Sequence, residues 1–235
     1  MNAARTEIFS TPQELAIRTA DWIDEIIDAA EAPFRIALAG GNTPRRLYGE
    51  LALRTIDWTE VQFYWIDERL VPPDHPDSNL RMARETLLSH IAVAPGQIHP
   101  MPTEGDADAA ARAYEANLKA GYGAAILDPA RPLFDLTLIG LGSDGHICSL
   151  LPGSPVLEER TRWVAPVTQG RPEARLTLTY PAVESSRLTV FLVTGPDKAE
   201  AVKRVRQGDR TLPGGRLNPQ GETVWLLDRG AARLL

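Results

Sequence analysis

Short apolar runs recur along this chain, and stretches whose apolar residues follow helical spacing separate them. The runs are rich in β-branched and aromatic residues, which is typical of strands buried on both faces. They lie at 34–39, 61–66, 134–139, 188–194 and 224–227, with a shorter alternating strand at 175–179. Because predicted strands and helices alternate throughout, the pattern predicts an α/β fold, a three-layer α/β/α sandwich.

The first helix has a clear start signal. Thr11 is placed as the N-cap, Pro12 at the first helical position and Glu14 for a capping box, and helical spacing continues to about residue 30. The other main helices are predicted at 44–53, 79–90, 106–118 and from about 198 to 206. For the helix at 79–90, Ser78 or Asn79 is the predicted cap.

Composition narrows the class of protein. With 235 residues and 43% hydrophobic content, the chain suffices for one domain with a sizeable core, so we predict a single domain over 1–235. A net charge of −6 and a pI near 5.3 argue against nucleic acid or an anionic membrane as the main partner. The single cysteine, Cys148, excludes an intramolecular disulfide. With no run of 18 apolar residues and no apolar leader in the first 15, we expect a soluble cytoplasmic protein.

A glycine turn joins the strand at 34–39 to the helix that follows it. The turn reads Gly40-Gly41-Asn42-Thr43-Pro44. Backbone N–H groups at such a turn point outward and the helix dipole favours negative charge, so the segment predicts an anion site. A plain turn with Thr43 capping the helix explains the same residues. The segment is not a Walker A loop, because the Gly-Lys-Ser/Thr ending is missing.

Charged residues follow two more strands. Asp67, Glu68 and Arg69 come directly after the strand at 61–66, at the edge where parallel sheets bind ligands. A solvated loop is the alternative, and Glu68 either pairs with Arg69 or faces solvent. Lys198 is predicted in the first turn of a helix, where the dipole disfavours a cation; it either shares an anion there or is an ordinary surface lysine.

The strand at 134–139 runs into a glycine-rich loop that carries Asp144 and His146. The loop fits GxGxxG, but a dinucleotide site also needs an uninterrupted helix, and Pro152, Gly153 and Pro155 break the following segment. A serine nucleophile elbow is excluded, because a leucine stands where its first glycine is needed. Asp144 and His146 alone are too few ligands for a metal ion.

His146 remains as a proton-transfer group, since the ordinary pKa of imidazole, ~6.5, lies near working pH. Asp144, two residues earlier, is placed to orient the imidazole or to stabilise its protonated form. Taken alone, Asp-x-His equally describes a structural histidine that caps a turn. His90 and His99 have no partner at ligand or catalytic spacing, so we expect them on the surface or in packing.

Five sequence strings, taken in order, resemble a known family. They are LAGGNTP, WIDERLVP with a later SN, LIGLGSDGHICSLLPG, ARLTLT and VTGPDKAEAV. Together they resemble the 6-phosphogluconolactonases, whose superfamily also contains the glucosamine-6-phosphate deaminases. The likeness runs from about Ala37 to Asp228, and its most specific element is GLGSDGH followed by SLLPG. The resemblance implies a modified Rossmann-type sandwich with a mostly parallel sheet.

The resemblance also implies an activity: hydrolysis of 6-phospho-D-glucono-1,5-lactone to 6-phosphogluconate in the oxidative pentose phosphate pathway. It implies no metal or organic cofactor, a small phosphosugar lactone as partner, and a monomer or homodimer. His146 would be the general base, supported by Asp144. The residues that the motifs place on the substrate are Gly40, Gly41, Asn42, Thr43, Arg175 and Lys198 at the phosphate, with Asp67 and Arg69 at the substrate-binding edge.

Four positions depart from the family pattern. Asn42 stands where serine is commoner, Ile147 and Cys148 where threonine and alanine are usual, and Leu151 where phenylalanine is frequent. We expect Cys148 to be buried and inert.

The sequence Gly-His-Ile also occurs in deaminases, but there it continues Phe-Asn-Glu-Pro and supplies a carboxylate. Here the next five residues, 148–152, contain no acid, and the Asp-Glu-Arg triplet resembles the lactonases where deaminases tend to show Asp-Glu-Tyr. The alternatives are a glucosamine-6-phosphate isomerase/deaminase and a non-catalytic sugar-phosphate-binding regulator.

Overall fold

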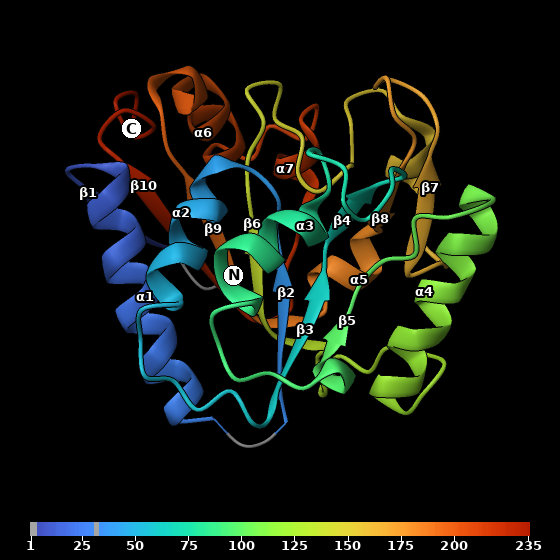
Figure 1. The fold of residues 1–235 in the computed structure, drawn as a ribbon. Helices are drawn as coiled ribbons and strands as arrows, with labels where there is room; N and C mark the ends of the chain where they lie inside the picture. Colours follow the sequence, from blue (N-terminus) through green and yellow to red (C-terminus); the bar gives the residue numbers. More distant parts are fainter. Residues whose placement is uncertain (1–3, 31–32) are drawn as a thin grey trace.

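A seven-stranded parallel sheet forms the centre of the molecule (Figure 1). The computed structural model describes residues 4–30 and 33–235. In spatial order the strands are β1 (Arg5–Phe9), β10 (Glu222–Asp228), β9 (Ser186–Val193), β6 (Phe134–Ile139), β2 (Phe34–Leu38), β3 (Val61–Trp65) and β5 (Ile98–His99), and every neighbouring pair runs parallel. The five strands predicted from apolar runs are confirmed, and so is the α/β/α class.

The outermost strands were not predicted, and their composition explains why. Along β1 the residues are half-buried or exposed and include Arg5 and Glu7, because an edge strand is covered on fewer sides. β5 is only two residues long. Neither segment has the continuous apolar run that marks β6, whose last four residues are all buried.

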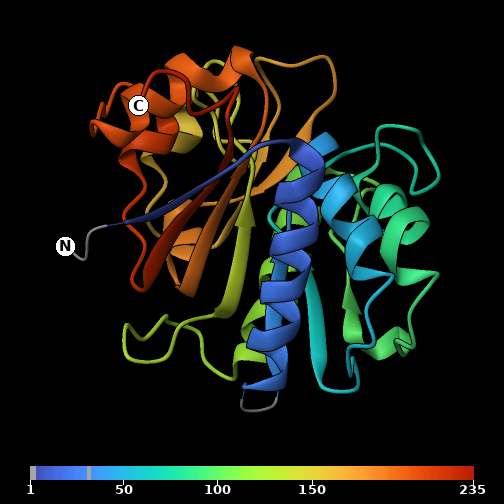
Figure 2. The same cartoon turned by 90° about the vertical axis from the view of Figure 1, so that its left-hand side faces the viewer.

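Helices cover both faces of the sheet (Figure 2). α1 (Pro12–Asp28), α2 (Asn42–Leu51) and α3 (Asn79–Ala83) lie on one face, and α6 (Ala199–Arg206) lies on the other. Right-handed crossovers require this division, since β2 leads on to β3 in one direction across the sheet and β9 leads on to β10 in the opposite direction. α4 (Ala107–Tyr122) and α5 (Tyr180–Glu184) pack against a second, smaller sheet.

This second sheet corrects one part of the sequence prediction. Asp67, Glu68 and Arg69 are not a loop: they form β4 (Asp67–Arg69), which pairs antiparallel with β8 (Arg175–Leu178), and β8 pairs antiparallel with β7 (Val164–Val167). A bond from the Leu178 N–H to the Ile66 carbonyl, 2.8 Å long, joins the sheet to the end of β3. The strand predicted at 175–179 is confirmed as β8, whereas β4 is too short and too polar to be recognised from an apolar pattern.

The helix starts agree with the sequence in three cases and differ in one. Thr11, Ser78 and Asp106 cap α1, α3 and α4 through their side-chain oxygens. α2 begins at Asn42 rather than near Pro44, so Thr43 does not cap it. α3 continues as a π-helical segment, η1 (Arg84–Leu88), and in the described residues no helix is long and apolar enough to cross a membrane.

The carboxylate of Asp228, at the end of β10, holds the turn that follows the neighbouring strand β9. It accepts the Gly195 N–H at 3.0 Å and the Ala231 N–H at 2.7 Å. Gly195 has φ +103°, a left-handed conformation that favours glycine, and it leads into the short 3-10 turn η4 (Pro196–Lys198). Asp228 therefore fixes the start of the segment that carries Lys198.

Replacing Asp228 with alanine leaves both N–H groups without their charged acceptor. Hydrogen bonds to charged groups contribute roughly 1.5–3 kcal/mol, so we expect the free energy of unfolding to fall by about 2 kcal/mol in urea denaturation. Asp197→Ala, which removes an exposed carboxylate from the same turn, is the control and should change it by less than about 0.5 kcal/mol. Equal effects of the two substitutions would contradict the role of Asp228.

Candidate functional site

A pocket opens where the strand order reverses. β2 and β6 are neighbours, yet the chain leaves β2 toward β3 and leaves β6 toward β9, so the loops after the two strands diverge. Such a reversal leaves a crevice at the carboxyl ends of the strands, the usual ligand site of open parallel sheets. The pocket is lined by Gly40 and Gly41 after β2 and by Gly140, Leu141 and Gly142 after β6.

The glycine turn after β2 leaves the start of α2 open toward the pocket. Gly41, the N-cap, has φ +103° and no side chain, so the first N–H groups of α2 have no capping oxygen from that residue. Asn42 and Thr43 line a second hollow, which shares Gly40, Gly41 and Lys198 with the first. The Thr43 hydroxyl lies 2.8 Å from that of Thr194 and so links this turn to the end of β9.

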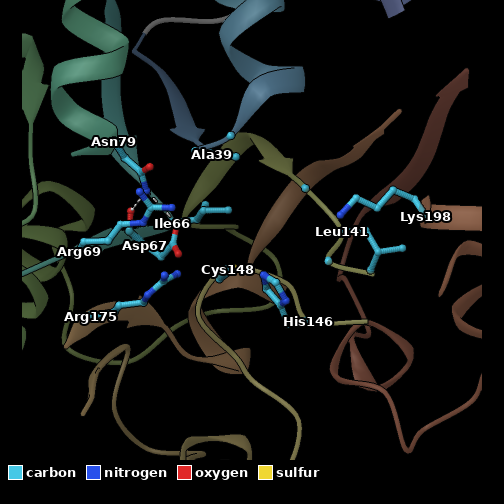
Figure 3. A pocket seen from close by; sticks show the side chains of 14 residues that line it. Ala39, Ile66, Asp67, Arg69, Asn79, Leu141, His146, Cys148, Arg175 and Lys198 are labelled. Atoms are coloured by element: carbon cyan, nitrogen blue, oxygen red, sulfur yellow. Dashed lines mark hydrogen bonds between the residues drawn. The ribbon is translucent and has the colours of Figure 1, made fainter. Parts of the chain in front are cut away.

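Three cations border the pocket. In the view of Figure 3, Arg69 and Arg175 lie on one side, Lys198 lies on the other, and His146 lies between them. Arg69 and Arg175 are direct neighbours across β4 and β8, and the Nε atom of each is buried without a hydrogen-bond partner in the described residues. Two guanidinium groups held side by side with free donors form a site suited to an anion.

Burial lowers the pKa of the Arg175 guanidinium; Asp67 opposes this shift and Arg69 adds to it. Lys198 ends the 3-10 turn and is the N-cap of α6. The sequence predicts Lys198 inside the first turn of this helix, but the helix begins one residue later, at Ala199. Its ammonium group lies 3.4 Å from Asp197.

Asp67 lines the same pocket with a buried carboxylate that two side chains hold in place. Ser149 Oγ donates to Asp67 Oδ2 at 2.6 Å, and the Asn79 amide donates to Oδ1 at 3.3 Å and to the Asp67 carbonyl at 3.0 Å. A Cβ at Gly40 would lie 2.0 Å from Asn79 Oδ1, so only glycine leaves room for this amide. The sequence pattern predicts Asn79 only as a possible helix cap and indicates no role for Ser149.

Glu68 neither pairs with the Arg69 guanidinium nor faces solvent. Its buried carboxylate accepts the N–H groups of Arg69, Asn79 and Leu80, each at 2.8 Å, and the Ser78 hydroxyl at 3.1 Å. Burial raises the pKa of Glu68, and the three backbone hydrogen bonds oppose that shift. Glu68 therefore ties β4 to the start of α3, and so sets the distance between Asp67 and Asn79.

His146 and Asp144 form a hydrogen-bonded pair at the rim of the pocket. Asp144 Oδ1 lies 2.5 Å from His146 Nδ1. Burial would raise the pKa of Asp144, but hydrogen bonds and charge from His146, helped by Arg171, hold that pKa below its ordinary value. An ionised Asp144 accepts a proton-bearing Nδ1, which leaves the lone pair on His146 Nε2, an atom without a hydrogen-bond partner in the described residues.

Arg171, like Ser149, belongs to this site but is not predicted from the sequence. Its Nη2 donates to Asp144 Oδ2 at 3.1 Å and lies 3.5 Å from His146 Nδ1. Its loop precedes β8 and has no apolar pattern or motif that would have drawn attention to it.

Cys148 is buried and lines the pocket at φ +50°, and burial raises the pKa of its thiol, as expected for an inert cysteine. Ile147 and Leu151, two departures from the family pattern, are also buried. In residues 4–30 and 33–235, His, Cys, Asp and Glu side chains form no cluster of three that could hold a metal ion.

The predicted site residues are therefore close together. Gly40, Gly41, Asp67, Arg69, His146, Arg175 and Lys198 line the main pocket, Asn42 and Thr43 line the adjoining hollow, and Asp144 contacts His146.

Comparison with known proteins defines the class. The family model described as glucosamine-6-phosphate isomerases/6-phosphogluconolactonase matches residues 10–225, so the chain belongs to this family. The 6-phosphogluconolactonase of Mycobacterium tuberculosis (strain ATCC 25618 / H37Rv) is 42% identical over 218 residues, 88% of this chain and 87% of that protein.

Two solved structures share the fold. The 6-phosphogluconolactonase from Trypanosoma cruzi matches with a TM-score of 0.87 at 30% identity, over 99% of this chain and 97% of that one. A structure described as a monomeric glucosamine-6-phosphate deaminase matches with a TM-score of 0.82 at 24% identity, over 98% of this chain and 100% of that one. The second likeness shows the fold alone.

Gly142 tests whether the geometry of the pair matters. A Cβ at this position would lie 2.1 Å from His146 Nδ1 and 2.5 Å from Asp144 Oδ1, so Gly142→Ala must displace both side chains. We expect turnover of the substrate proposed below to fall roughly 100-fold, while the free energy of unfolding falls by only about 1 kcal/mol, because two partly exposed side chains can move aside.

Gly140→Ala is the control for stability, since a Cβ at Gly140 meets nothing within 4 Å. The measurements are steady-state turnover and urea denaturation of both variants. Full turnover by Gly142→Ala would show that the position of this pair does not matter.

Proposed function

We propose that this protein hydrolyses 6-phospho-D-glucono-1,5-lactone to 6-phosphogluconate. Family membership and 42% identity to a 6-phosphogluconolactonase support the reaction class. The observation that carries the mechanism is the His146 imidazole, held through Nδ1 by Asp144, beside a pocket bordered by three cations. One base and one anion site are what hydrolysis of a phosphorylated lactone requires.

The phosphate binds at the start of α2 in this proposal. Backbone N–H groups of the Gly40 to Thr43 turn contact it, and Lys198 and Arg175 supply positive charge. Arg69 contacts the sugar portion, and Asp67 accepts hydrogen bonds from sugar hydroxyl groups. A substrate held by its phosphate presents its carbonyl carbon to His146 in a fixed orientation, which lowers the entropic part of the barrier.

The reaction then needs one base that becomes an acid. His146 Nε2 takes a proton from water as the water oxygen bonds to the lactone carbonyl carbon. Cationic side chains and loop N–H groups stabilise the negative charge that develops on the carbonyl oxygen. The tetrahedral intermediate collapses with cleavage of the bond from carbon to ring oxygen, and the protonated His146 gives its proton to that oxygen. The product is an open-chain acid, which ionises and releases one proton.

The surroundings of His146 favour hydrolysis over deamination. The deaminase pattern places a carboxylate shortly after this histidine, and residues 148–152 here contain none. Ser149, three residues after His146, donates to Asp67 instead, and Cys148 and Leu151 are buried. A non-catalytic regulator would have no use for a histidine and carboxylate pair at the pocket rim.

Acid release from freshly prepared 6-phosphogluconolactone, corrected for spontaneous hydrolysis, tests the function directly. We expect wild-type protein to accelerate it and His146→Ala to lower kcat roughly 10²–10⁴-fold with little change in KM, because the base acts in the transition state. His90→Ala is the matched control, because His90 is an exposed histidine that follows η1 and does not line the pocket.

Two further readouts identify the alternatives. Ammonia release from glucosamine-6-phosphate would indicate the deaminase, and phosphosugar binding without turnover would indicate the regulator. Wild-type turnover in His146→Ala would remove His146 from the mechanism, even if the lactonase activity stands.

A further inference from the structure

Arg171 connects the second sheet to the loop that carries His146. It lies in the hairpin between β7 and β8, 25 residues beyond His146 in the chain. Its Nη2 donates to Asp144 Oδ2 at 3.1 Å and lies 3.5 Å from His146 Nδ1. Arg171 lies outside the five sequence motifs that resemble the family, and it is not among the residues that line the pocket.

The Asp144 carboxylate is therefore held at both oxygens. Oδ1 faces His146 Nδ1 at 2.5 Å and the His146 N–H at 3.2 Å, while Oδ2 accepts from Arg171. A carboxylate bonded at one oxygen can still turn about its last side-chain bond, and a bond at the second oxygen stops that rotation. Because the imidazole follows the plane of the carboxylate, the direction of Nε2 depends on Arg171.

We propose that Arg171 is a positioning residue for the base: through Asp144 it aims His146 Nε2 at the substrate. This proposal rests on the proposed lactone hydrolysis. A contribution to folding does not explain the contact, because the Arg171 and Asp144 side chains are 35% and 41% exposed, and exposed ion pairs add at most about 1 kcal/mol.

Two substitutions separate geometry from charge. Arg171→Gln removes both, so we expect kcat to fall roughly 10-fold and KM to stay within about twofold. Arg171→Lys keeps the charge but loses the planar fork, so kcat should fall in this variant as well.

Arg187→Gln is the matched control. It removes the same charge from an exposed arginine whose partner, Asp135, lies at the start of β6, the sheet edge opposite the pocket. We expect its kcat and KM to equal those of the wild type.

A spectroscopic readout keeps this proposal separate from the proposed function. The ring ¹⁵N signals of the four histidines are recorded in the free protein, and those of His146 are identified by their loss in His146→Gln. We expect the His146 signals to shift in Arg171→Gln but not in Arg187→Gln.

Two results would overturn the role of Arg171: His146 ¹⁵N signals and kcat unchanged in Arg171→Gln, or a rise in KM alone, which would make Arg171 a substrate contact. Absence of lactone hydrolysis by the wild type would instead refute the proposed function, and the ¹⁵N signals would still report whether Arg171 positions His146.

Discussion

Parallel pairing of β2 with β6 is the constraint on which the site depends. Since the chain continues from these two strands in opposite directions, neither following loop can cover the other, and both glycine-rich turns face one crevice. One turn begins α2 and offers backbone N–H groups, and the other carries His146. The proposed phosphate site and the proposed base, about 100 residues apart in the sequence, are thereby brought to one edge of the sheet.

The pocket gathers positive side chains although the chain as a whole is acidic. The protein has a net charge of −6, yet Arg69, Arg175 and Lys198 converge on the pocket. Two buried carboxylates beside them have different tasks. Asp67 lies among the cations of the pocket, whereas Glu68 turns away and accepts backbone N–H groups of α3. Adjacent residues of one short strand therefore serve the ligand and the fold separately, because side chains alternate between the two faces of a strand.

The main sheet was predictable from the sequence because each of its central strands is a continuous apolar run followed at once by glycine or charge. The same pattern located the residues around the pocket, since carboxyl ends of parallel strands share an edge. Of the second sheet only β8 was predictable, as the alternating strand at 175–179. Its pairing with β4 was not, because Asp67 to Arg69 are polar and lie about 100 residues away. Arg171 and Ser149 were missed for a related reason, because their contacts with Asp144 and Asp67 arise only when distant segments meet.

The two sheets also divide the pocket into parts of different origin. The turns of the parallel sheet supply the backbone N–H groups and His146, whereas β4 and β8 supply Asp67, Arg69 and Arg175. The hairpin between β7 and β8 ends in solvent-exposed residues, so a change in its length leaves the register of the parallel sheet intact. The same change would move Arg171 and, through Asp144, the imidazole of His146, so this exposed hairpin can alter the site without altering the sheet that holds it.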